Sequence, residues 1–113
     1  MTKQIIKNVG GKIIYECEAE TFKEAIEEAV KKGVSLEYAD LLKTNFTNAN
    51  LTGSNFRSAF LYGAIFKNAN LTNANFRSAF VDDANFENAI LENIKHSNQK
   101  EILEALNKEK KNA

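Results

Sequence analysis

Residues 34 to 93 divide into twelve consecutive five-residue units, and this period constrains the fold more than any other feature of the chain. Two places before the centre of each unit, eleven of the twelve residues are small and nine are alanine. Side chains two residues apart in extended backbone lie on one face, so each unit points one large and one small residue inward. The large, apolar central residues are Leu36, Leu41, Phe46, Leu51, Phe56, Leu61, Phe66, Leu71, Phe76, Val81, Phe86 and Leu91.

The sequence also repeats with a longer period of twenty residues, which equals four of the five-residue units. The segment NANLTGSNFRSAF at 48–60 recurs as NANLTNANFRSAF at 68–80. The central residues sort by the same period into stacked core columns. Two of these columns are Phe46, Phe66 and Phe86, and Leu51, Leu71 and Leu91. Four units therefore make one coil, and residues 34–93 predict an all-β solenoid of about three coils with four short sides, rising roughly 14 Å.

The units resemble those of the pentapeptide-repeat family, in which Ala is followed by Asp or Asn and then by Leu or Phe. Ala39-Asp40-Leu41, Ala69-Asn70-Leu71 and Ala84-Asn85-Phe86 carry the resemblance. It implies a right-handed four-sided β-helix, and the whole chain is similar to small members from bacteria and their phages. The resemblance implies no single function, because one fold serves many functions.

Residues 1–33 predict an N-terminal cap for the open end of the solenoid, since an uncovered end exposes unpaired backbone groups. Residues 4–9 and 12–19 are β-prone and flank a Gly10-Gly11 turn, which is typical of a hairpin. A helix follows, with Thr21 and Glu24 as a capping box and Gly33 as its stop. Its apolar face, which we expect to lie on the first coil, consists of Phe22, Ala25, Ile26, Ala29 and Val30.

Residues 94–113 predict a C-terminal helical cap and tail, so that the chain forms one folding unit. Asn98 with Glu101 indicates the helix start, and Ile102, Leu103 and Leu106 form its apolar stripe. The lysines at 108, 110 and 111 suit the negative end of the helix dipole.

The residues give little support for an enzyme, a metal site or a cofactor. The chain has one histidine, His96, one cysteine, Cys17, and no glycine-rich phosphate loop. A single cysteine forms no intramolecular disulfide and gives a metal no thiol cluster. No apolar run approaches the roughly 18 residues that cross a bilayer. The apolar segment near the N-terminus is too short for a secretory signal. We therefore expect a cytoplasmic protein without membrane contact.

Charge argues against the alternative function that the resemblance implies, the DNA mimicry by which some family members of the quinolone-resistance type modulate bacterial gyrase. The coils carry six acidic residues against four basic ones, six minus four, a net of minus two. Imitating 14 Å of duplex needs about eight negative charges. We expect the purified protein to leave gyrase supercoiling and its quinolone inhibition unchanged at low micromolar concentration. Arg57 and Arg77 are too few to predict nucleic-acid binding.

The chain departs from the repeat pattern at the outward position before the central residue. This position, ordinarily Asn or Asp, holds Phe60, Ile65, Phe80 and Ile90. Phe60 and Phe80 are one coil apart and should stack. We expect Leu42 and Tyr62 beside them, and Arg57 and Arg77 on the adjoining side.

Apolar residues on an outer wall usually mark a contact surface. Three explanations remain open at this point: coverage by a terminal segment of the same chain, a homodimer, or another protein. The predicted function is a non-enzymatic scaffold or protein–protein interaction module.

Overall fold

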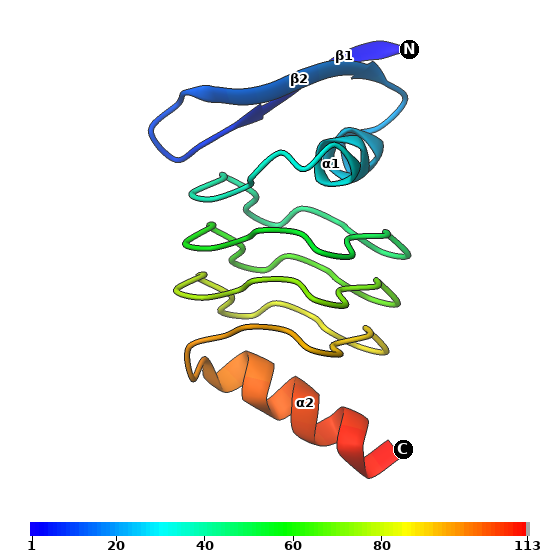
Figure 1. The fold of residues 1–113 in the computed structure, drawn as a ribbon, viewed down its shortest axis with the longest axis vertical. Helices are drawn as coiled ribbons and strands as arrows, with labels where there is room; N and C mark the ends of the chain where they lie inside the picture. The colour runs from blue at the N-terminus through cyan, green and yellow to red at the C-terminus, as the bar shows by residue number, and fades with distance from the viewer. Residues whose placement is uncertain (113) are drawn as a thin grey trace.

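The computed structural model describes residues 1–112, and describes side chains as far as Lys108. Residue 113, the last of the predicted C-terminal cap and tail, and the side chains of the lysines at 110 and 111 lie outside the described part. The molecule is elongated, 41 × 25 × 22 Å. A hairpin and a helix cover one end of a stack of coils, and a second helix covers the other end (Figure 1).

The repeat forms stacked coils with a period of twenty residues. Isolated parallel bridges join Asp40 to Phe60 and Phe60 to Phe80, and equivalent bridges run along the other three sides as far as Lys95. We number the coils 1 (residues 36–55), 2 (56–75) and 3 (76–95). Each side contributes a single bridged residue, because a turn every five residues leaves too little extended backbone for a longer strand. The coils continue two residues beyond the predicted end at 93.

Backbone hydrogen bonds run from coil to coil along the long axis. Each central amide from Leu36 to Phe76 donates to a carbonyl nineteen residues later, as Leu41 N does to Phe60 O at 3.0 Å. The outward residue donates in the opposite direction, as Phe60 N does to Ala39 O at 2.9 Å. Every side of coil 2 is therefore bonded on both edges, and only the two ends of the stack need other partners.

A left-handed residue marks every corner. The second residue after each central position has positive φ in all twelve units, from 54° at Lys43 to 73° at Gly53. In the first eleven units the next amide donates back to the central carbonyl, as Ala39 N does to Leu36 O at 3.0 Å. Positive φ at the third residue of such a turn is the type II arrangement, and it explains why five of the twelve positions are Asn and two are Gly.

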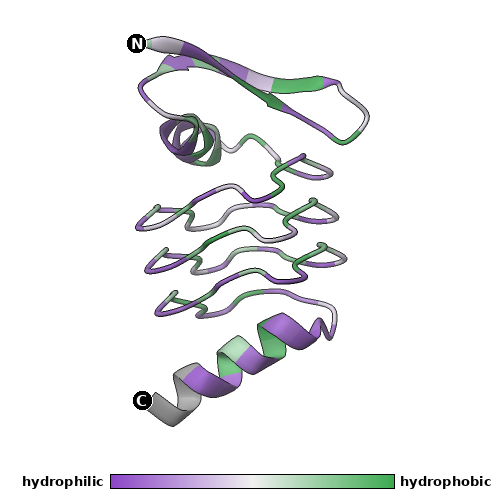
Figure 2. Ribbon diagram, turned by 180° about the vertical axis from the view of Figure 1, so that it is seen from behind, coloured by the Kyte–Doolittle hydropathy of each residue, from purple (hydrophilic) through white to green (hydrophobic). Residues whose placement is uncertain are grey.

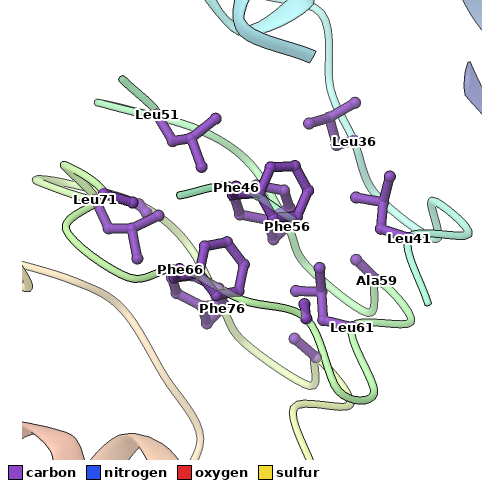
Figure 3. Close-up of a cluster of buried hydrophobic side chains, with 14 of the residues drawn as sticks. Leu36, Leu41, Phe46, Leu51, Phe56, Ala59, Leu61, Phe66, Leu71 and Phe76 are labelled. Atoms are coloured by element: carbon purple, nitrogen blue, oxygen red, sulfur yellow. The ribbon is translucent and has the colours of Figure 1, made fainter. Parts of the chain in front are cut away.

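The large central residues form the core. All twelve are buried, and the most exposed, Phe86, retains only 8% of its accessible surface. Figure 3 shows the Phe and Leu side chains of successive coils meeting inside the stack. The rings of Phe46 and Phe66 stack with centroids 4.9 Å apart, and those of Phe66 and Phe86 with centroids 5.2 Å apart. Along each coil, hydrophobic residues alternate with hydrophilic ones (Figure 2).

Two inward positions carry a hydroxyl, Thr44 and Ser54, and of these only Ser54 is fully buried. Ser54 is 2% exposed, and its Oγ has no hydrogen-bond partner among the described residues. A buried polar group without a partner costs about 1–3 kcal/mol. Ala74 occupies the same position one coil below, so alanine fits this site. We expect Ser54→Ala to raise the free energy of unfolding by about 1 kcal/mol. Urea denaturation measures this, and a decrease would show that the hydroxyl has a stabilising role.

The expected hairpin is present. Strand β1, Thr2–Lys7, pairs antiparallel with β2, Ile13–Ala19, with a bulge at Ile6/Lys7. Both strands stop short of the predicted turn, because Asn8 Oδ1 accepts from Gly10 N at 2.9 Å and Lys12 N at 3.0 Å and so widens it. The hairpin then bonds to the edge of coil 1: Asp40 N donates to Lys7 O, and Val9 N donates to Tyr38 O.

Helix α1, Phe22–Lys31, lies between the hairpin and coil 1, as its sequence predicts (Figure 1). Thr21 Oγ1 accepts from Glu24 N at 3.1 Å. At the other end Gly33 has φ 76° and a Schellman pair of bonds ends the helix. The predicted apolar face packs on the core, with Ala25, Ile26 and Ala29 fully buried.

Two charged side chains of α1 also form hydrogen bonds with backbone groups on the open edge of coil 1. Lys23 Nζ donates to Thr47 O at 3.0 Å, and Glu27 Oε2 accepts from Asn50 N at 2.8 Å. The N-terminal cap therefore combines apolar cover with specific hydrogen bonds to the backbone groups that the first coil leaves open.

Helix α2, Lys100–Asn112, caps coil 3 but differs in detail from the prediction. It begins two residues after Asn98, which adopts φ 28°. The capping contacts come instead from Gln99, whose Nε2 donates to Phe76 O at 2.8 Å and to Ala79 O at 3.3 Å. Ile102 is fully buried, whereas Leu103 is 38% exposed. The predicted stripe is wrong at Leu103, and Ala105 packs on the core with Leu106 in its place.

Candidate interaction surface

The outward position before each central residue normally holds a turn-forming asparagine. In six units its Oδ1 accepts from the backbone N–H two residues later, over 2.8 to 3.3 Å. The six residues are Asn45, Asn50, Asn55, Asn70, Asn75 and Asn85. This short-range bond supports the corner that follows. A phenylalanine or isoleucine at the same position cannot make it.

Phe60 and Phe80 occupy that position on one side of the stack and contact each other. Their ring centroids are 4.8 Å apart in an edge-to-face arrangement. Tyr62, on the next corner, meets Phe60 at 5.9 Å and stacks on Phe80 at 5.7 Å. We call these three rings, together with Leu42 above them, the aromatic face. It brings together the four apolar residues that the sequence places in the candidate surface.

The aromatic face is open to solvent. Phe80 is 40% exposed and Leu42 is 50% exposed, while Phe60 and Tyr62 are half-buried by each other. The hairpin and the two helices lie at the ends of the stack rather than along its sides (Figure 1). Tyr38, at the corner before Asp40, is also 50% exposed and extends the apolar surface. Tyr38 is not among the residues predicted for this surface, although a tyrosine at a left-handed corner position was a usable signal.

Charged residues flank the aromatic face on both corners. Arg57 pairs with Glu37 at 3.2 Å on one corner, and Arg77 lies one coil below Arg57. Asp82 and Asp83 lie on the opposite corner at the level of Phe80, and both are exposed. Among the described residues, Arg77 and these two aspartates have no ion-pair partner. The surface therefore carries unpaired positive charge on one side of Phe80 and unpaired negative charge on the other.

The two isoleucines at outward positions do not join the aromatic face. Ile65 is half-buried on the next side of the stack. Ile90, 45% exposed, lies on the side after that and lines a groove of about 1050 Å³ between coil 3 and α2. Glu87, Glu101 and Glu104 give this groove an acidic rim.

A polar cluster joins β2 to α1 at the N-terminal end. Tyr15 donates a hydrogen bond to Glu28, which raises the pKa of the Tyr15 hydroxyl and lowers the pKa of the Glu28 carboxyl. Lys32 Nζ lies 3.9 Å from Glu28, and the nearby Tyr15 raises the pKa of this lysine. Burial raises the pKa of the Cys17 thiol, so this cysteine stays protonated at neutral pH. The cluster fastens the hairpin to the helix.

The Glu28 carboxyl predicts a loss of stability in acid. A carboxyl whose pKa is lowered by folding stabilises the protein above its unfolded pKa, and this contribution disappears as pH falls through the folded pKa. We expect the parent to lose more unfolding free energy than Glu28→Gln when pH falls from about 6 to about 3. The exposed Glu18→Gln variant on β2 is the control and should follow the parent. Equal losses in all three proteins would contradict the assignment.

No helix among residues 1–112 has the length and apolar character to cross a membrane. Within the same residues, no group of three or more His, Cys, Asp or Glu side chains is arranged to hold a metal ion.

Comparison with known proteins places the repeat in a family. The chain matches no curated protein. It is similar to a solved structure, a pentapeptide repeat protein (Rfr23) from the cyanobacterium Cyanothece 51142, with 33% identity and a TM-score of 0.39. That match covers 57% of this chain and 40% of the other chain, so this chain spans less than half of its length. The family profile described as pentapeptide repeats matches residues 32–68 and 61–93 with eight copies. With more than half of its residues matched, the chain belongs to the pentapeptide-repeat family.

Proposed function

We propose that the chain is a non-enzymatic protein-interaction module, in which a right-handed four-sided β-helix presents the aromatic face to another protein molecule. The observation that carries this proposal is the replacement of asparagine by Phe60 and Phe80 on one side. Each replacement gives up a corner-supporting hydrogen bond that six other units make. It also leaves an aromatic cluster in water, which is unfavourable without a partner.

The stack suits such a role because it holds the rings in fixed positions. Phe60 N and Leu61 N are both bonded to neighbouring coils, at 2.9 and 2.8 Å, so the backbone beneath the aromatic face has little freedom to lose on binding. Opposite charges also pair on the coil surface, as in Lys67 with Glu87 at 3.9 Å. Such pairing works against the strongly acidic surface that DNA mimicry requires.

Affinity capture tests the proposal. The parent protein, immobilised, should retain a protein from a bacterial lysate or an untagged copy of itself, identified by mass spectrometry. Phe60→Asp combined with Phe80→Asp should lose that protein. Coil 1 already carries Asp40 at this position on the same side, so the variant is compatible with the fold. Asn45→Asp combined with Asn85→Asp adds the same charge on another side and should retain it. Equal retention by all three proteins would refute the proposal.

A further inference from the structure

We propose that the partner of the aromatic face is a second copy of this chain, in a dimer whose two-fold axis runs parallel to the long axis of the stack. This inference rests on the proposed function and specifies its partner. It follows from the order of charges on the two corners that border the face.

In each coil the chain turns one corner before it reaches the aromatic face, here called the leading corner, and another after it, the trailing corner. The leading corner carries Glu37 in coil 1, Arg57 in coil 2 and Arg77 in coil 3. The trailing corner carries Leu42 and Lys43, then Tyr62 and Gly63, then Asp82 and Asp83. Bridges between Asp40, Phe60 and Phe80 fix the vertical alignment of these levels.

A two-fold axis along the stack places each leading corner against the trailing corner of the same coil in the second copy. Glu37 then faces Lys43, and Arg77 faces Asp82 and Asp83. Arg57 faces the ring of Tyr62, a favourable cation–π geometry. Because the contact is isologous, each of these pairs forms twice. The free charges beside Phe80 thus acquire partners of opposite sign, while Phe60 and Phe80 pack against their own counterparts.

The antiparallel alternatives fit less well. With the two-fold axis perpendicular to the stack at the level of coil 2, Glu37 faces Arg77 and Lys43 faces Asp83. The same arrangement places the Asp40 carboxylate against Phe80 and brings the two Arg57 side chains together. With the axis between coils 2 and 3, the rings of Phe60 and Phe80 meet, but Arg57 is brought against Arg77. An unpaired charge buried in an interface and like charges in contact both weaken binding.

The parallel arrangement has one unfavourable contact, because the two Asp40 side chains meet near the axis at the coil 1 level. It therefore predicts that Asp40→Asn tightens the dimer severalfold. A single side of three coils is also a small contact, in the class of interfaces below about 1,200 Å². We accordingly expect a reversible dimer that is detected in a concentration series.

Solution mass gives the first test. Light scattering should show the parent moving from 12.7 kDa towards twice that mass as concentration rises. Phe80→Asp should stay monomeric, and Ile90→Asp, an equivalent change on another side, should dimerise like the parent. Circular dichroism verifies that each variant is folded. A parent that stays monomeric overturns the inference, and the proposed function is then tested separately by foreign proteins in the capture experiment.

Charge reversal gives the second test and identifies the orientation. Arg77→Asp should weaken self-association by about tenfold or more, because each new carboxylate faces Asp82 and Asp83. Asp82→Lys with Asp83→Lys should do the same, and Lys43 shows that the corner accepts lysine at positive φ. Mixing the two variants should restore a heterodimer. Rescue of Arg77→Asp by Glu37→Arg instead would establish the antiparallel dimer and overturn the parallel one.

Discussion

Truncating Phe66 to alanine is expected to lower the free energy of unfolding by about 3–5 kcal/mol, the range observed when a large aromatic side chain is removed from a packed core. Phe66 is fully buried at the centre of the stack. Its ring stacks between those of Phe46 and Phe86 and meets Phe56 and Phe76 edge-on, at 5.9 and 5.8 Å.

The cavity left by Phe66→Ala has little means of closing. The coils above and below are tied to this level by backbone bonds, Phe46 N to Ile65 O at 2.6 Å and Phe66 N to Asn85 O at 2.7 Å. Chemical denaturation followed by circular dichroism measures the effect. Thr52→Ala, on an exposed corner, is the control and should change stability by no more than about 0.5 kcal/mol. Similar small effects for both variants would contradict the inward and outward assignment.

Ile102→Ala is expected to cost about 2–4 kcal/mol, because Ile102 is the fully buried residue by which α2 holds the end of coil 3. Its neighbour Leu103 provides a matched control on the same helix. Leu103 is 38% exposed, so Leu103→Ala should cost less than about 1 kcal/mol. Urea denaturation of the two variants measures the difference. Equal costs would mean that α2 is rotated about its axis from the described position.

Loosening α2 should have a second consequence. It would expose the apolar end of coil 3 and the backbone groups that Gln99 now covers, and such edges associate with one another. We expect Ile102→Ala to form concentration-dependent aggregates larger than a dimer at a temperature where the Leu103→Ala variant does not. Light scattering during a slow temperature ramp distinguishes the two.

Much of this fold could be predicted because its signals are local or periodic. The twenty-residue period alone placed Phe60 above Phe80, and Thr21, Glu24 and Gly33 marked the ends of α1 through contacts within a few residues. The C-terminal cap was less predictable. Its decisive bonds join Gln99 to carbonyls at Phe76 and Ala79, more than nineteen residues away, and nothing near Asn98 signals them.

The candidate surface was likewise predictable where it depends on the repeat period and unpredictable where it depends on packing. The period predicted which residues share a side, but it could not give the ring orientations or the exposure of Tyr38. The tilt of α2, which buries Ile102 and leaves Leu103 outside, depends on packing against the whole of coil 3. Likewise the bond from Tyr15 to Glu28 depends on how a strand and a helix meet, which neither segment encodes alone.

Because each coil bonds to the next through the same backbone donors and acceptors, the stack can be lengthened by whole coils. The hydrogen bonds from the hairpin and α1 reach only coil 1, and those of Gln99 reach only coil 3. Coil 2 presents the same donors and acceptors on its lower edge as coil 1 does. An inserted copy of residues 56–75 would therefore add one strand spacing, about 4.8 Å, and leave both terminal contacts intact. The same insertion would add a third phenylalanine and a third arginine to one side, so the contact area would grow with each repeat gained.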